Sequence, residues 1–201
     1  FAQGPLYARL RRMRAALPLS KITDDEFDQM VTRGLPFVLG RVELRDGFLH
    51  RKNAQYIPHG VSKMRLFRNL DRAIAGAAPT LETSVEISVR FGGGFTPLPD
   101  IVVWKRTRER GAIPGANVLL IAEIADTTQA DDLGAKRDAY ARAGLAEYWA
   151  VDLPARTLHR FAVPQDGTYQ QAAVFTEGST VDSLTIPGVS VVFEIPDQFA
   201  A

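Results

Sequence analysis

Residues 117–124 read Asn-Val-Leu-Leu-Ile-Ala-Glu-Ile, a nearly continuous apolar run with one carboxylate close to its end. Residues 98–104 read Leu-Pro-Asp-Ile-Val-Val-Trp and form a second segment rich in Val and Ile, as strands are. The stretch between them is charged, contains Gly and Pro, and is too short for a crossover helix. We therefore expect the two segments to pair as antiparallel strands, in a meander that begins with residues 85–91.

This pairing brings two acids together. If residues 105–116 form a hairpin loop centred near Gly111, Asp100 and Glu123 fall almost opposite one another, with Cβ atoms about 5 Å apart. Adjacent carboxylates cost free energy unless they are protonated or neutralised, and Mg²⁺ prefers oxygen ligands. A carboxylate that ends an apolar run, as Glu123 does, is also costly without a partner. The sequence therefore predicts a divalent metal site at Asp100 and Glu123.

A helix is predicted over residues 132–143, with Gly144 as its left-handed terminator. Asp132, Lys136 and Tyr140 are spaced i, i+4 and i+8, so they share one face of it. Taken alone, this face is better explained as a salt bridge beside a phenol than as part of a site.

The remaining elements are predicted from local signals. Thr23 and Glu26 have the spacing of a capping box, which predicts a short helix to about Thr32. Apolar residues at helical spacing predict a second helix over residues 61–74, whose basic residues are expected in solvent. Those basic residues are Lys63, Arg65, Arg68 and Arg72. The predicted strands are residues 37–45 and 48–52 around Asp46-Gly47, residues 147–152, and short strands after Thr157 around Asp166-Gly167, Glu177-Gly178 and Pro187-Gly188.

The composition indicates the class of protein. A chain of 201 residues, 46% hydrophobic and 23% charged, is long enough for one sizeable core, so we expect one domain over residues 1–201. The absence of cysteine excludes disulfides, thiolate zinc sites and a cysteine nucleophile, and it predicts a cytoplasmic location. The apolar runs fall far short of the about 20 residues that span a bilayer, so no membrane partner is expected. Residues 1–20 are expected to form a flexible basic segment.

Several segments together resemble a known family. The segments that carry the likeness are residues 43–47, 99–103, 120–124 and 136–152, with His59 before a helix. They look like the Uma-type putative restriction endonuclease family, over a similarity that runs from Thr23 to about Phe193. Members resemble the PD-(D/E)xK nucleases, which implies an α/β (α+β) fold with a restriction-endonuclease-like core. A mixed central sheet flanked by helices, with extra C-terminal strands, is therefore expected.

The resemblance also implies a set of site residues. Asp100 and Glu123 match the two acids that bind Mg²⁺ or Mn²⁺ in that superfamily. The usual lysine lies two residues after the second acid, but Ala125 stands there, which implies that the lysine has migrated to the helix as Lys136. Glu43 is implied as an additional acid. The supporting residues are Tyr140, Asp132 and His59.

The expected function is metal-dependent hydrolysis of phosphodiester bonds in DNA. A net charge of +1 neither supports nor excludes a nucleic-acid partner. Two alternatives remain open: a nuclease-like scaffold that binds nucleic acid or a protein without cutting, and a nuclease for RNA or a free nucleotide. Residues 124–128 depart from the family pattern directly after the second acid, which puts the loop before the Lys136 helix in question. Cutting both strands of a duplex with one site per chain favours a homodimer.

Overall fold

The computed structural model describes residues 21–34 and 40–196. The basic segment predicted at residues 1–20 and the start of the strand predicted at residues 37–45 lie outside the described residues. The elements are α2 (Asp24–Thr32), β1 (Val42–Arg45), β2 (Phe48–Arg51), α4 (Ile57–Ala77), β3 (Leu81–Val85), β4 (Val89–Arg90), β5 (Ile101–Lys105), β6 (Ile113–Pro114), β7 (Val118–Ala125), α5 (Lys136–Arg142), β8 (Glu147–Asp152), β9 (Thr157–Gln165), β10 (Thr168–Thr176), β11 (Thr180–Asp182) and β12 (Ser190–Val192). That residues 1–201 form one domain stays a prediction.

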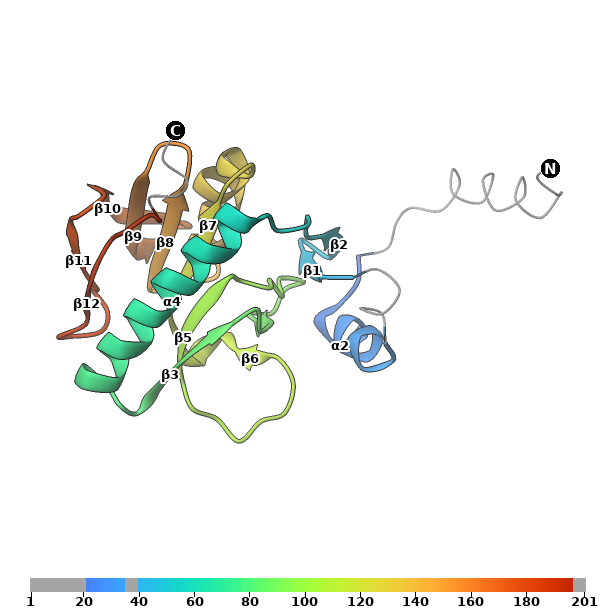
Figure 1. The fold of residues 1–201 in the computed structure, drawn as a ribbon. Coiled ribbons are helices and arrows are strands. Elements are labelled where there is room, and N and C mark those ends of the chain that lie inside the picture. The colour runs from blue at the N-terminus through green and yellow to red at the C-terminus, as the bar shows by residue number, and fades with distance from the viewer. Residues whose placement is uncertain (1–20, 35–39, 197–201) are drawn as a thin grey trace, which may run out of the picture.

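The core is a six-stranded mixed sheet with the strand order β10-β9-β8-β7-β5-β3. Strands β7 and β8 are parallel and the other neighbours are antiparallel. The chain passes from β7 to β8 through α5, because parallel neighbours need a crossover connection. Helix α4 lies across one face of the sheet (Figure 1), and α5 packs against the other face through Tyr140. The predicted α+β fold with a mixed central sheet flanked by helices is confirmed.

Strand β7 is buried on both faces, which explains its nearly continuous apolar sequence. Alternate residues from Leu120 to Ile124 pack in the cluster under α4, whereas Ile121 packs in the cluster under α5. Because side chains alternate along a strand, Glu123 lies on the α5 side together with Ile121. The same alternation places Asp100 on the α5 side together with Val102.

The predicted pairing of the two central segments is confirmed. Strands β5 and β7 are antiparallel with Ile101 opposite Ala122, so Asp100 comes opposite Glu123 one step further along. The backbone N–H of Asp100 points to Glu123 Oε2 at 3.4 Å. The register of this hairpin therefore sets the two acids side by side.

The predicted first strand of the meander is wrong. Strand β3 (Leu81–Val85) pairs with β5, and the chain leaves the central sheet after Val85. Glu86 has a φ of 54°, a left-handed conformation that ends the strand. Strand β4 then pairs in parallel with β6 in a small separate sheet. The Val and Ile residues of 85–91 indicated β structure but not which sheet it joins.

Helix α4 begins at Ile57, four residues before the predicted start, because Pro58 is tolerated in the first turn of a helix. His59 therefore lies in the first turn. The prediction that Lys63 is in solvent is also wrong: this residue is 6% exposed. Gln55 and Glu86 cover this turn of the helix and accept hydrogen bonds from the Lys63 ammonium.

The helix predicted over residues 132–143 is present, but it starts with a π-helical turn, Asp131–Ala135, that runs directly into α5. Gly144 ends it with a φ of 76°. The predicted capping box of α2 is confirmed as well. Within residues 21–34 and 40–196, no helix has the length and apolar character needed to cross a bilayer.

The last strands are tied to the sheet by a buried carboxylate. Glu147 Oε1 accepts a hydrogen bond from Trp149 Nε1 at 2.7 Å. Glu147 Oε2 accepts four more, from the Ser183 hydroxyl, the Leu184 N–H, and the N–H and hydroxyl of Thr185, at 2.8–3.0 Å. Glu147 therefore satisfies the polar groups of the loop that follows β11.

Candidate active site

The predicted site residues line one cavity of about 160 Å³. The cavity lies where the β1–β2 hairpin and the first turn of α4 meet the strands β5 and β7 and the π-helical turn. Its lining includes Glu43, His59, Asp100, Glu123, Asp132 and Lys136. Tyr140 joins these residues from α5, because its hydroxyl donates a hydrogen bond to Glu123. The structure thus brings all seven predicted residues together.

Asp100 follows the loop before β5 and is 2% exposed. Its Oδ2 accepts a hydrogen bond from the Ile124 N–H at 3.0 Å and lies 3.1 Å from His59 Nε2. Its Oδ1 accepts a hydrogen bond from Gln55 Nε2 at 3.1 Å. Strand β7 and two side chains from the first half of the chain therefore fix this carboxylate.

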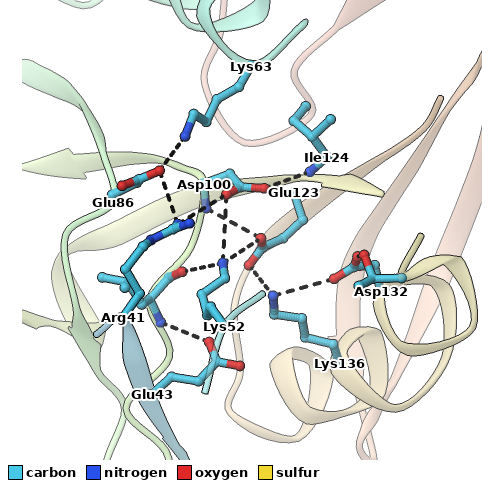
Figure 2. Close-up of polar contacts among 12 residues, drawn as sticks. Arg41, Glu43, Lys52, Lys63, Glu86, Asp100, Glu123, Ile124, Asp132 and Lys136 are labelled. Carbon is cyan, nitrogen blue, oxygen red and sulfur yellow. Dashed lines mark hydrogen bonds and ion pairs between the residues drawn. The ribbon is translucent and has the colours of Figure 1, made fainter. Parts of the chain in front are cut away.

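Glu123 is held from the α5 side. Its Oε1 accepts hydrogen bonds from the Tyr140 hydroxyl at 3.0 Å and pairs with Lys136 Nζ at 2.7 Å. Lys136 Nζ also lies 3.4 Å from Asp132 Oδ1, and Asp132 accepts a hydrogen bond from the Thr128 hydroxyl. Figure 2 shows Lys136 between the two carboxylates. The face shared by Asp132, Lys136 and Tyr140 is thus turned towards Glu123.

The pKa values of the two central acids are shifted in opposite directions. Burial works against the charge of Asp100, but the hydrogen bond from His59 and the charge of Lys52 outweigh it and hold its pKa well below the ordinary value. Burial raises the pKa of Glu123, although Lys136 and Lys52 pull against it. Asp100 is therefore firmly ionised, and Glu123 is the carboxylate that depends on nearby cations.

Lys136 stays charged in the buried site. Burial lowers its pKa, but the charges of Glu123 and Glu43 overcome this effect and hold the pKa above the ordinary value. Its ammonium can therefore donate hydrogen bonds and offset negative charge, whereas it has no free electron pair with which to take a proton.

Glu43 lies on β1 and is 1% exposed. Its Oε1 is 2.7 Å from Arg45 Nε, and its Oε2 accepts a hydrogen bond from the Leu98 N–H at 3.2 Å. Burial raises its pKa, but the charges of Lys136, Lys52 and Arg45 hold the pKa below the ordinary value. Glu43 is thus an ionised acid in the wall of the cavity, bound to partners other than Asp100 and Glu123.

Several further polar residues lie in the cavity or beside it and were not predicted from the sequence. Among them are Arg41, Lys52 and Gln55, which line the cavity, and Lys63 and Glu86, which lie beside it. Figure 2 shows Arg41, Lys52, Lys63 and Glu86. Lys52 had the clearest signal, because it directly follows the strand that pairs with β1, on which Glu43 lies. Its backbone N–H donates to the Arg41 carbonyl at 2.9 Å. The other four had no local signal that distinguished them from surface residues.

The donor set fits a hard divalent cation. Asp100 and Glu123 offer carboxylate oxygens from neighbouring positions in a polar cavity, and Mg²⁺ is commonly bound by one or two carboxylates with retained waters. Within the described part of the chain, no group of three or more His, Asp or Glu side chains is arranged to hold a metal ion. The two carboxylates of Asp100 and Glu123 are therefore the side chains that we consider as metal ligands.

Comparison with known proteins identifies the family and a related fold. Residues 25–195 match the Uma2 family model, described as "Putative restriction endonuclease". A solved structure, a putative nuclease belonging to DUF820 from Anabaena variabilis, has a similar fold with a TM-score of 0.57 and 17% identity, over 72% of this chain and 82% of that one. No curated protein matches the chain. Because the family model spans most of the sequence, the chain belongs to the Uma2 family of restriction-endonuclease-like proteins.

Proposed function

We propose that this protein is a metal-dependent endonuclease that hydrolyses phosphodiester bonds in DNA. The observation that carries the proposal is the pair of buried carboxylates, Asp100 and Glu123, with the Lys136 ammonium 2.7 Å from the second of them. Membership of the Uma2 family and the fold shared with a putative nuclease support it. Mg²⁺ or Mn²⁺ is the proposed cofactor, with Asp100 and Glu123 as its protein ligands.

Each of the seven predicted residues has a proposed role in this hydrolysis. Asp100 and Glu123 would hold a divalent ion, which would supply Lewis-acid polarisation of the phosphoryl group and lower the pKa of a bound water. Lys136 orients the attacking water and offsets the negative charge that develops at phosphorus. Tyr140 and Asp132 hold Glu123 and Lys136 in place. Glu43, an ionised carboxylate in the cavity wall, would hold a metal-bound water or a second ion, and His59 orients Asp100.

The size of the cavity favours a polymer over a free nucleotide. At about 160 Å³ it is smaller than the roughly 300–1,000 Å³ of typical small-molecule pockets. It has room for a phosphate group, while the bases of the substrate stay outside. Arg51 and Tyr56 line its mouth, and Tyr56 is 71% exposed. We propose that these two side chains contact the flanking backbone and bases.

The test is a plasmid-cleavage assay with Mg²⁺ or Mn²⁺, combined with metal titration by calorimetry. Asp100→Asn keeps the shape of the side chain and removes its charge, so it should lose metal binding and reduce cleavage at least about a hundredfold. Glu82→Gln is the matched control, because Glu82 is a carboxylate on the neighbouring strand β3 that pairs with Arg106 instead. Full cleavage by Asp100→Asn would contradict the proposal.

A second candidate is a scaffold that binds nucleic acid without cutting it. The observation in its favour is that Lys52 and Lys136 already pair with the two carboxylates. It predicts that the wild-type protein shifts a DNA fragment on a gel in EDTA, and that neither Mn²⁺ nor Asp100→Asn changes this binding. Sedimentation of the same samples tests whether the DNA-bound form is the proposed homodimer.

A further inference from the structure

Lys52 is the first residue after β2, and its side chain enters the cavity from the β1–β2 hairpin. Its Nζ lies 3.5 Å from Glu123 Oε2 and 3.7 Å from Asp100 Oδ1, and it donates a hydrogen bond to the Leu98 carbonyl at 2.7 Å. The ammonium group is therefore placed between the two carboxylates (Figure 2).

The two neighbouring lysines, Lys136 in the cavity and Lys63 beside it, are placed differently. Lys136 pairs with Glu123 and Asp132 and does not contact Asp100. Lys63 pairs with Glu86 and Gln55. Among residues 21–34 and 40–196, Lys52 is the one cationic side chain that forms an ion pair with both members of the carboxylate pair. The Lys52 ammonium therefore lies near the oxygen atoms that would attract a divalent ion shared by the two carboxylates.

We propose that Lys52 is a tethered counter-cation that neutralises Asp100 and Glu123 in the metal-free protein and moves aside when a divalent ion enters. This inference rests on the metal site of the proposed function. An ammonium and a dication at the same oxygens repel one another, so they compete. Lys52 is better suited to leave than Lys136, because its side chain is 14% exposed against 4%. The flexible stem of a lysine allows this movement without a change in the strand.

The first test is Mn²⁺ titration by calorimetry on the wild-type protein and on Lys52→Met, which keeps the length of the side chain and removes the charge. If the lysine competes with the ion, the variant should bind Mn²⁺ roughly 5- to 100-fold more tightly. Lys63→Met is the matched control, since Lys63 is also a buried lysine near the cavity but contacts neither carboxylate. Its affinity for Mn²⁺ should stay close to that of the wild type.

The second test uses the wild-type protein alone and so does not depend on the folding of a variant. Acetic anhydride labels free amines, and mass spectrometry measures the labelled fraction of each lysine. Saturating Mn²⁺ should increase the labelling of Lys52, because its ammonium leaves the carboxylate pair, and should leave Lys63 unchanged.

The outcomes separate this inference from the proposed function. Wild-type binding of Mn²⁺ with equal or weaker binding by Lys52→Met, or with unchanged labelling of Lys52, would overturn the role of Lys52 and leave the metal site standing. Binding by Lys52→Met alone would support the inference in its strongest form. If neither protein binds Mn²⁺, the metal-dependent function fails and the role of Lys52 falls with it.

Discussion

Tyr140 combines two functions in one side chain. Its ring packs edge-on against Phe95, with centroids 5.5 Å apart, and its hydroxyl holds Glu123. Tyr140→Phe keeps the ring and removes the hydrogen bond to a charged partner, so it should lower the free energy of unfolding by about 1.5–3 kcal/mol, as measured in urea. Cleavage should fall while remaining measurable, in contrast to Lys136→Met, which should abolish it. Equal cleavage by Tyr140→Phe and the wild type would show that Glu123 needs no orienting hydroxyl.

The hydrogen bonds of Glu147 allow a prediction about the stability of the fold that does not depend on the candidate site. The amide nitrogen of Glu147→Gln cannot accept a hydrogen bond, so at least one buried donor from Trp149 or from residues 183–185 would lose its partner. We expect a loss of at least about 2 kcal/mol in the free energy of unfolding. Glu82→Gln, at an exposed pair, should cost less than about 1 kcal/mol in the same urea titration. Similar losses for the two variants would contradict the role given to Glu147.

At the scale of elements, helix α2 is attached by its first turn. Asp24 accepts hydrogen bonds from the Gly94 N–H and the Thr96 hydroxyl, and Phe27 is buried. Glu26 closes the capping box by accepting hydrogen bonds from the N–H and hydroxyl of Thr23 at 2.8 and 2.9 Å. These bonds hold the pKa of Glu26 below its ordinary value. The cap therefore links the stability of α2 to pH.

The sign of this pH dependence follows from the direction of the shift. A carboxylate whose pKa is lower in the folded state stabilises the fold above its unfolded pKa of about 4.3, and this contribution is lost as the pH falls through the folded value. Glu26→Gln should therefore be less stable than the wild type at pH 7, and the difference should narrow towards pH 3. Thermal unfolding at both values measures it, with Asp71→Asn as the control on α4. A difference that widens at low pH would exclude the cap as its cause.

The elements that could be predicted are those with strong local patterns. The apolar run of β7 has a carboxylate at a defined position, so the hairpin register with β5 and the Asp100–Glu123 pair followed from the sequence. Strand β4 was assigned to the wrong sheet because strand propensity does not specify a partner. Lys63 was expected in solvent because helical periodicity describes one helix and not what packs against its polar face.

At the scale of the whole molecule, the site joins segments far apart in the sequence. The hydrogen bond from Gln55 to Asp100 spans 45 residues, and the ion pair from Arg45 to Asp131 spans 86. Such contacts depend on how the β1–β2 hairpin and α4 pack onto the sheet. The positions of Gln55 and Arg41 were for this reason beyond prediction, whereas Lys52 had a signal in its place directly after β2 and Lys136 was implied by the family resemblance.

Metal binding should stabilise the whole fold. A ligand that binds the folded state alone stabilises it by about 2.7 kcal/mol at a concentration one hundred times its dissociation constant. Mn²⁺ should therefore raise the midpoint of thermal unfolding of the wild-type protein, measured by calorimetry, and EDTA should reverse the change. Asp100→Asn should show no such rise. An equal rise in the variant would locate the ion elsewhere on the molecule.

The π-helical turn before α5 has a geometric consequence for the site. In a regular α-helix, two side chains four positions apart point in directions that differ by about 40° around the helix axis. Asp132, Lys136 and Tyr140 would therefore spread over about 80°. A wider turn advances less per residue, which cancels part of this rotation between Asp132 and Lys136. The extra residue in the π-helical turn thus brings the side chains of Asp132 and Lys136 closer to the side of the helix on which Tyr140 lies. Deleting Gly134 would leave Asp132 and Lys136 three positions apart, which in a regular α-helix separates them by about 60° around the axis.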